Sequence, residues 1–212
     1  MPLYKTIKPN KHTTIYVWKI EASLCELSKE IELNERSKKR LLSMKSKLHQ
    51  RGFLSVRHLL REAGYTDFDL YYNENGKPHL KDGKNISITH SFNFSAIIIS
   101  DSEVGIDIEM NREKIKIIQH KFVNFESGFI HQDDDYIQQL TVIWGAKESL
   151  YKIYPHGGLT FKNDIDINSF QIIDKKTTGF IKAEDWQKSY NIYFEQVENF
   201  TLVYAIDPLS ND

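Results

Sequence analysis

The chain has 212 residues, of which 28 are basic and 29 acidic, and its formal net charge is -1. That balance provides no overall attraction to nucleic acid. Hydrophobic residues make up 40% of the chain, and no apolar run approaches the roughly 20 residues that a membrane helix needs. The composition therefore favours a soluble globular protein, built as one large domain or two smaller halves.

The start of the chain and its cysteine content favour a cytoplasmic protein. Residues 1–5 include a basic residue but no apolar segment of a secretion signal. Cys25 is the single cysteine, which excludes an internal disulfide and fits a reducing compartment.

Basic residues crowd the first third of the chain. They are Lys38, Lys39, Arg40, Lys45, Lys47, Arg51, Arg57 and Arg61. Such a run is usually a solvated helix face. It also suits a small phosphorylated ligand or an acidic protein.

Hydrophobic periodicity predicts strands and helices in both halves of the chain. In the first half, the predicted elements are a strand at 13–19, a polar helical region at 23–47 that starts at Asn34, a helix at 51–63 that stops at Gly64, and strands at 69–72, 86–90 and 95–100. In the second half they are a strand at 104–110, helices at 115–122 and 133–154, and strands at 169–173, 179–182, 189–195 and 200–206. The turn at 101–103 gives a hairpin-like order, which predicts an antiparallel sheet. The mixture predicts an α+β fold.

The strand at 104–110 carries two acids. Side chains on a strand alternate between its faces, so Asp107 and Glu109 point to one side. Ile106 and Ile108 point to the other side, into apolar packing. Two neighbouring carboxylates repel each other, and a bound cation removes that penalty. Mg²⁺ favours oxygen ligands of this kind, although an Asp-x-Glu pair on a surface strand commonly binds nothing.

The long helix downstream presents a row of three side chains. Trp144, Glu148 and Lys152 are spaced four apart and share one face. We hypothesise that Glu148 completes a Mg²⁺ site begun by Asp107 and Glu109. Lys152, one turn further on, would hold a phosphate bound to that metal. The alternative is an ordinary surface pair of Glu148 and Lys152, which Trp144 on the same face disfavours.

The segment Thr89-His90-Ser91 has two interpretations. His90 is either a satisfied strand histidine, which this segment alone favours, or a donor to a phosphate beside two hydroxyls. The other histidines show no metal-ligand spacing, so no zinc site is predicted. The chain contains no Walker A motif, Gly-x-Gly-x-x-Gly motif or Gly-x-Ser-x-Gly elbow, which disfavours a P-loop NTPase, a Rossmann enzyme or an α/β-hydrolase.

Four motifs occur in an order and spacing that resemble a known family. They are Gly76-Lys77-Pro78, Ser87-Ile88-Thr89-His90-Ser91, Val104-Gly105-Ile106-Asp107-Ile108-Glu109 and Trp144-x-x-Lys147-Glu148-x-x-x-Lys152. Together they resemble the surfactin-synthetase-type (Sfp-like) 4′-phosphopantetheinyl transferases. The segment from Phe122 to Glu126 resembles the Phe-x-x-x-Glu segment of that family, and the helix that starts at Arg51 resembles its first-half arginine helix. Where the family commonly has Ser-His-Ser, this chain has Thr89-His90-Ser91, which keeps the hydroxyl.

The resemblance implies a fold, a reaction and partners. The fold would be a monomer of two similar α+β halves in pseudo-twofold arrangement, residues 1–103 and 104–212, with coenzyme A in the cleft between them. The first half would hold the nucleotide side of coenzyme A, and the second half the metal-binding carboxylates and the catalytic helix. The reaction would transfer the 4′-phosphopantetheine arm to a serine of an acidic apo acyl or peptidyl carrier protein and release adenosine 3′,5′-bisphosphate.

The resemblance also implies roles for individual residues. The ligands of Mg²⁺, with Mn²⁺ as an alternative ion, would be Asp107, Glu109 and Glu148. The coenzyme A-binding residues would be Lys77 and Pro78 at the nucleotide end, Thr89, His90 and Lys152 at the phosphates, and Arg57, Arg51 and Lys47 near the 3′-phosphate. The catalytic residues would be Glu148, Lys152 and Asp107, with Glu148 or a water that it holds as the base and Lys147 tuning its charge.

Two other classes of function suit the same residues. Three carboxylates and a lysine also fit a Mg²⁺-dependent phosphohydrolase or nuclease, because the same groups stabilise phosphodiester cleavage. A non-catalytic module that binds carrier proteins is the second alternative. Such a binder has no need of Asp107, Glu109, Glu148 and Lys152 together.

Overall fold

The computed structural model describes residues 3–184 and 186–208 and divides into two compact units, Met1–Asp101 and Ser102–Asp212. Met1 and Pro2, in the segment for which the sequence predicts no secretion signal, lie outside the described residues. Both units combine helices with antiparallel sheets, which confirms the predicted α+β class. None of the described helices combines the length and apolar character needed to cross a membrane.

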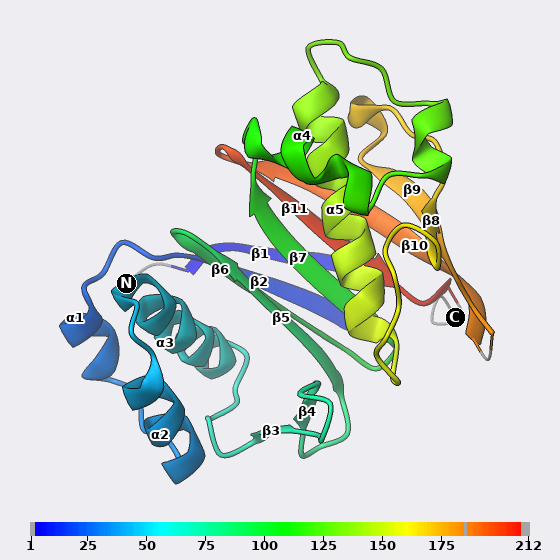
Figure 1. Cartoon of the computed structure of the whole chain (residues 1–212). Coiled ribbons are helices and arrows are strands. Elements are labelled where there is room, and N and C mark those ends of the chain that lie inside the picture. The colour runs from blue at the N-terminus through cyan, green and yellow to red at the C-terminus, as the bar shows by residue number, and fades with distance from the viewer. Residues whose placement is uncertain (1–2, 185, 209–212) are drawn as a thin grey trace. The chain divides into compact units, whose positions relative to one another are not determined.

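Unit 1 consists of a four-stranded antiparallel sheet, a small hairpin and three helices (Figure 1). Its elements are β1 (Leu3–Asn10), β2 (Thr13–Lys19), α1 (Leu24–Ser28), α2 (Glu35–Ser43), α3 (Lys47–Glu62), β3 (Leu70–Tyr72), β4 (Pro78–Leu80), β5 (Asn85–Ser91) and β6 (Phe94–Ser100). The sheet has the order β1-β2-β6-β5, and β3 pairs with β4. Helix α3 packs against β2, β5 and β6.

Helix α3 supplies much of the core of unit 1, and every residue from Gly52 to Leu60 is buried. Phe53, Val56, Leu59 and Leu60 are buried on it, as the helical period predicts. Complete burial of a leucine side chain stabilises a fold by about 1.5–3 kcal/mol, so these side chains account for much of the unit's packing. The helix begins at Lys47, four residues before the predicted start, because Ser46 accepts a hydrogen bond from the backbone of His49.

Unit 2 consists of a five-stranded antiparallel sheet covered by a long helix (Figure 1). Its elements are β7 (Val104–Met110), α4 (Lys114–Ile118), η1 (Gln119–Lys121), η2 (Phe125–Gly128), α5 (Tyr136–Ile153), β8 (Ile165–Ile167), η3 (Ile172–Asp174), β9 (Lys176–Ala183), β10 (Trp186–Val197) and β11 (Phe200–Ile206). The sheet has the order β7-β11-β10-β9-β8. Helix α5 packs on β7 and β11.

The two units share a connectivity. In each, a strand leads into helices, and two later strands return as a hairpin whose last strand pairs with the first strand. The resulting orders are β2-β6-β5 in unit 1 and β7-β11-β10 in unit 2. The long helix of each unit, α3 or α5, packs on the corresponding strands.

Two sequence-based predictions about the strands are wrong. The turn at 101–103 does not make a hairpin, because β6 and β7 belong to different sheets and β7 pairs with β11. The strand predicted at 169–173 is a loop that ends in the 3₁₀ turn η3. The sheet-edge strand in that region is β8, three residues long, which pairs with β9.

Candidate active site

Strand β7 presents its two acids to helix α5. Gly105 precedes them on the same face, and a Cβ added to it would lie 1.9 Å from the backbone oxygen of Ser149. Only glycine therefore allows α5 to lie this close to β7. Two residues further along, Asp107 is 5% exposed, and Ile106 and Ile108 are fully buried on the opposite face. This alternation confirms the predicted facing of the strand.

Lys152 reaches β7 from the last turn of α5. Its Nζ lies 2.9 Å from Oδ1 of Asp107 and donates to the backbone oxygen of Ile106 at 2.8 Å. The side chain of Lys152 is about a quarter exposed, so it retains access to solvent and to a ligand. The predicted proximity of Asp107 and Lys152 is present in the fold.

Glu148 lies one turn before Lys152 and feels both acids of β7. The pKa of its carboxyl is raised to about 7, mainly by burial and then by the negative charges of Asp107 and Glu109, while Lys152 acts in the opposite direction. The three carboxylates are thus close enough to perturb one another. One ammonium beside three carboxyl groups leaves this partly buried cluster with an excess of acidic groups.

The donor set fits a hard divalent cation by atom type and charge, because carboxylate oxygens are the ligands that Mg²⁺ prefers. The side chains do not surround a common point, however. Among residues 3–184 and 186–208, no three His, Cys, Asp or Glu side chains form a group that could hold a metal ion. The ammonium of Lys152 lies against Asp107 instead.

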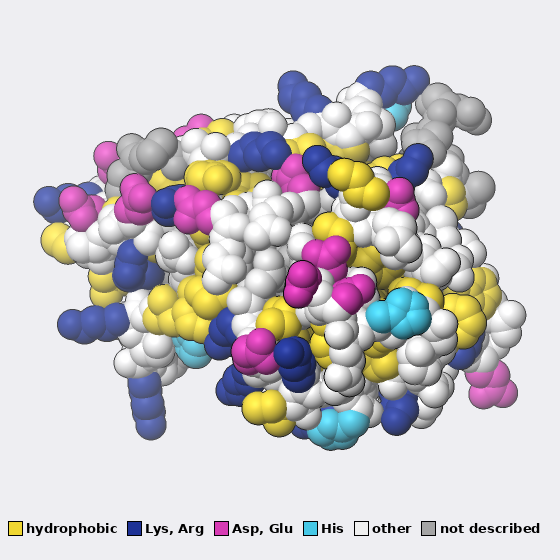
Figure 2. Space-filling model, turned by 90° about the horizontal axis from the view of Figure 1, so that it is seen from above, with side chains coloured by type: hydrophobic (Ala, Val, Ile, Leu, Met, Phe, Trp, Pro, Cys, Tyr) yellow, Lys and Arg dark blue, Asp and Glu magenta, His cyan; other side chains and the backbone are white. Residues whose placement is uncertain are grey.

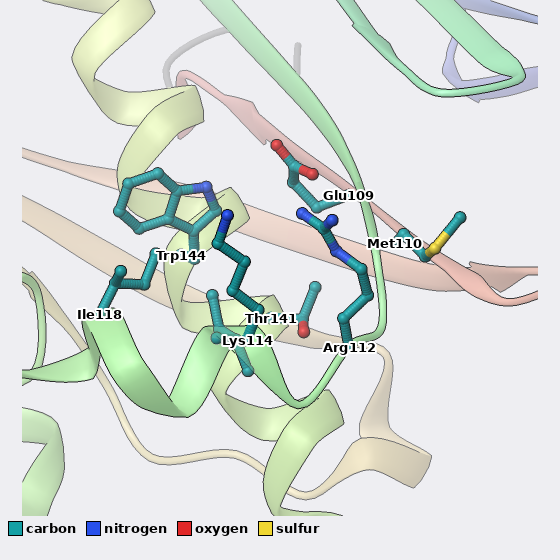
Figure 3. Close-up of a pocket in the computed structure, with 8 residues that line it drawn as sticks. Glu109, Met110, Arg112, Lys114, Ile118, Thr141 and Trp144 are labelled. Carbon is teal, nitrogen blue, oxygen red and sulfur yellow. The ribbon is translucent and has the colours of Figure 1, made fainter.

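A pocket of about 200 Å³ adjoins this cluster on the Glu109 side (Figure 3). It is lined by Glu109, Met110, Arg112, Lys114, Ile115, Ile118, Thr141 and Trp144. Figure 3 shows Arg112, from the segment after β7, extending toward Glu109, and Lys114, from the start of α4, extending toward the indole of Trp144 on α5. The pocket therefore combines an apolar lining with two cations and one acid.

Lys147 does not adjust the charge of Glu148, contrary to the prediction. It is completely buried on another face of α5, and its Nζ lies 2.7 Å from Oε1 of Glu126, which is also completely buried. The ammonium also donates to the backbone oxygens of Phe122 and Phe161, at 2.7 and 2.9 Å. Burial lowers the pKa of Lys147, and Glu126 opposes that shift. Glu126 of the Phe-x-x-x-Glu segment is thus the partner of Lys147. The sequence alone did not predict this pair.

Arg57 is also assigned a different role by the structure. Its side chain is 3% exposed, and its Nε lies 2.9 Å from Oδ1 of Asp67, whose side chain is 1% exposed. The guanidinium donates further to the hydroxyl of Ser37 and the backbone oxygen of Phe53. These bonds commit it to joining α2, α3 and the loop before β3, in place of the phosphate contact expected from the sequence.

Arg51 and Lys47 occupy the first turns of α3. The guanidinium of Arg51 donates to the backbone oxygens of Ala22 and Ile20, at 3.0 and 2.6 Å, and so fastens the segment that follows β2. Lys47, the first residue of the helix, is exposed. Of the three basic residues expected near a phosphate in unit 1, Lys47 is the one whose side chain extends into solvent.

The remaining predicted ligand-binding residues lie on two hairpins of unit 1. Thr89 is buried and His90 exposed near the end of β5. Lys77 and Pro78 are half-buried at the β3–β4 hairpin, where the backbone N–H of Lys77 donates to Asn73 and Pro78 pairs with Tyr72. Unit 1 therefore carries these four residues on strand ends and turns.

Residues 103–205 match the model of a known family, the 4′-phosphopantetheinyl transferase superfamily. They form a domain of this superfamily. A comparison with the curated proteins finds no matching relative.

The matched transferase domain contains β7, α5 and the whole cluster of Asp107, Glu109, Glu148 and Lys152. The 4′-phosphopantetheinyl transferase superfamily acts on carrier proteins with coenzyme A as substrate, and typically uses a divalent metal. The superfamily part of the resemblance is thereby confirmed for this unit. Lys77, Pro78, Thr89 and His90 precede the matched transferase domain.

Proposed function

We propose that this protein is a transferase of the surfactin-synthetase type that moves the 4′-phosphopantetheine arm of coenzyme A to a serine of an apo acyl or peptidyl carrier protein. The reaction depends on Mg²⁺ and releases adenosine 3′,5′-bisphosphate. The observation that carries the proposal is the cluster of Asp107, Glu109 and Glu148 with Lys152 inside the matched domain. The protein acts as a monomer in the cytoplasm, which its single cysteine suits.

The charges of the cluster suit a substrate that carries a pyrophosphate. Asp107, Glu109 and Glu148 would supply the oxygen ligands of the divalent ion once their side chains turn toward a common point, and the bound ion would neutralise phosphoryl oxygens and polarise the phosphorus. Lys152 would exchange its bond to Asp107 for a phosphate oxygen, because it keeps both solvent access and a flexible stem. In unit 1, Lys77 and Pro78 would line the nucleotide end, and Thr89 and His90 would donate to phosphate.

The chemical step needs a proton acceptor and a stabilised leaving group. The serine hydroxyl forms a new bond to the phosphorus next to pantetheine, and the bond from that phosphorus to the bridging oxygen breaks. Glu148, or a water that it holds, accepts the hydroxyl proton. Lys152 stabilises the charge that develops on the departing phosphate.

The acceptor protein would approach the pocket beside Glu109. Arg112 and Lys114 extend into that pocket and suit an acidic surface, and its apolar lining suits a hydrophobic side chain. Ile117 on α4 is 71% exposed and Phe125 on η2 is 53% exposed, so exposed apolar side chains also occur on the segments between β7 and α5. The carrier would thus be recognised by charge and by one or more apolar contacts.

The deciding experiment is intact mass spectrometry of a purified apo-carrier after incubation with the protein, coenzyme A and Mg²⁺. We expect the carrier to gain one phosphopantetheine arm and free adenosine 3′,5′-bisphosphate to appear. Chelation of the metal, or the substitution Asp107→Ala, should abolish the gain while the protein stays folded by circular dichroism.

Other outcomes of the same assay would contradict the proposal. Release of adenosine 3′,5′-bisphosphate from coenzyme A without any acceptor would indicate a hydrolase. Stable carrier binding with no change of mass under Mg²⁺ would indicate a binding module. A panel of carriers from fatty acid, polyketide and peptide synthesis is needed, because the acceptor is not specified by the residues above.

A further inference from the structure

A glycine inside helix α3 lies close against a histidine from the neighbouring strand β5. Gly52 is buried in the helix interior, where glycine costs about 1 kcal/mol relative to alanine. A Cβ at this position would lie 3.1 Å from Cγ and Nδ1 of His90, closer than a side chain normally approaches. The imidazole of His90 therefore lies close against the helix backbone, and a methyl group at position 52 would push it away by a few tenths of an ångström.

A second histidine stands beside the first. His49 lies three residues before Gly52, so the two share a face of α3. The ring centroids of His49 and His90 are 6.3 Å apart, and both side chains are exposed. Two imidazoles from different elements thus face one solvent-accessible region of unit 1.

We propose that His49 is a second phosphate-binding histidine, which acts with His90 on one phosphate group of coenzyme A, and that Gly52 positions the pair. This inference rests on the proposed function and adds a binding residue to it. Hydrogen bonds from imidazole N–H to a phosphate oxygen are about 2.8 Å long, so two rings at this separation reach oxygens of the same phosphate. The guanidinium of Arg51 donates to the backbone oxygens of Ile20 and Ala22, so it is committed within unit 1 and is not a donor to the same phosphate.

The inference is tested by the affinity for coenzyme A, measured by calorimetry, and by the KM in the transfer assay. We expect His49→Ala to weaken coenzyme A binding about tenfold, the usual loss for one hydrogen bond to a charged group, and to leave kcat close to that of the wild type. His12→Ala is the matched control, because His12 is an exposed histidine of the same unit that pairs with Asp101. It should bind coenzyme A as the wild type does.

The phosphate is identified by repeating the measurement with 3′-dephospho-coenzyme A. If His49→Ala no longer affects the affinity for this analogue, the pair binds the 3′-phosphate. If the tenfold loss persists, the pair binds the pyrophosphate. Both results support a phosphate contact of His49.

Gly52→Ala tests the positioning of His90 separately. The added methyl group should displace the ring, so the NMR signal of the His90 imidazole should move in the free protein and the affinity for coenzyme A should fall. A wild-type His90 signal with wild-type affinity would contradict the role of Gly52.

The inference fails on its own if the wild type transfers phosphopantetheine and His49→Ala binds coenzyme A equally well. If the wild type binds no coenzyme A, both the proposed function and the inference about His49 fail. The two failures are therefore distinguished by the wild-type measurement alone.

Discussion

Lys152 is the cation that stabilises Asp107 in the candidate active site. Its substitution should lower the rate of transfer while the protein stays folded. Its side chain is 26% exposed, so a methionine fits the position without creating a cavity. We expect Lys152→Met to lower the transfer rate on the order of 10²–10³-fold, because the charge on the leaving phosphate loses its partner. The rate is measured with a carrier and coenzyme A at saturation, and folding by thermal denaturation.

A matched control for this variant is Lys182→Met, which removes the ion pair of Lys182 with Asp166 in the same unit. That pair is partly exposed, so its loss should change neither rate nor stability by much. A wild-type rate in Lys152→Met would exclude Lys152 from the reaction.

His58 should make the stability of unit 1 depend on pH. It is fully buried, stacks on Trp18 and bonds through Nε2 to the backbone oxygen of Leu27 at 3.0 Å. Its Nδ1 has no hydrogen-bond partner among the described residues. Burial lowers the pKa of His58 below its ordinary value of 6.5, and Leu27 only partly opposes that shift.

Because the folded-state pKa of His58 is the lower one, the unfolded chain binds the proton first as the pH falls. The contribution of His58 to stability is therefore complete above pH 6.5 and is lost as the pH drops toward the folded-state value. Urea denaturation at pH 8 and pH 5, followed by tryptophan fluorescence, measures the slope. His58→Gln, which keeps a donor for Leu27, should be less stable at pH 8 and show a smaller slope. An unchanged slope would contradict the assignment.

At the scale of single residues, sequence patterns predicted directions along one element but not partners from elsewhere. The period of the strand placed Asp107 and Glu109 on one face, and the period of the helix placed Glu148 and Lys152 on one face. Arg57 and Lys147 were assigned wrongly because their partners, Asp67 and Glu126, are 10 and 21 residues away in the sequence. Burial of an ion pair depends on the folded packing, which periodicity does not encode.

The segment before α5 is attached to that helix by a buried ion pair. Lys147 and Glu126 are each completely buried, and Glu126 also accepts the backbone N–H groups of Asn124 and Ile167. Glu126→Gln would leave an ammonium buried without its counter-charge, and such a change costs about 3–5 kcal/mol. We expect the free energy of unfolding to fall by about this amount in urea denaturation.

The double variant Glu126→Gln with Lys147→Met provides the control. It removes both charges, so it should regain part of the stability that the single variant loses. A single variant as stable as the wild type would show that the pair contributes nothing to the attachment of this segment.

At the scale of elements, strong periodic patterns were sufficient to predict where some strands begin and end. The strands predicted at 13–19 and 200–206 have the bounds observed for β2 and β11. The polar helical region at 23–47 does contain a helix that starts after Asn34, but it is split into two helices, α1 and α2. Short edge strands such as β8 were missed because three residues are too few to show a period.

At the scale of the whole molecule, charge is balanced but locally segregated. Figure 2 shows basic and acidic side chains interspersed over the face in view, with hydrophobic areas between them. Helix α2 and the start of α3 depart from this balance, because residues 35–47 contain Arg36, Lys38, Lys39, Arg40, Lys45 and Lys47 against the single acid Glu35. Arg36 and Arg40 are held over the ring of Tyr72, each 5.5 Å from its centroid. This segment is therefore a local basic surface on a neutral protein.

An acidic carrier protein should use this basic surface for its approach. Lys39 and Lys45 are exposed, so their reversal to glutamate should leave the fold intact. We expect the double variant Lys39→Glu, Lys45→Glu to raise the KM for the carrier on the order of tenfold at low salt, because long-range attraction is replaced by repulsion. The KM for coenzyme A should change less than the KM for the carrier.

The dependence of the carrier KM on salt concentration distinguishes a loss of long-range attraction from the loss of a direct contact. The Debye length falls from about 10 Å at 0.1 M salt to about 3 Å at 1 M, so the difference between variant and wild type should shrink as salt is added. Lys8→Glu, on the edge strand β1 of the same unit, is the matched control for a charge reversal and should retain the wild-type KM. A carrier KM that is unchanged at low salt would place the approach of the carrier on another surface. A rise in the carrier KM that is the same at every salt concentration would indicate a lost direct contact, which long-range attraction does not explain.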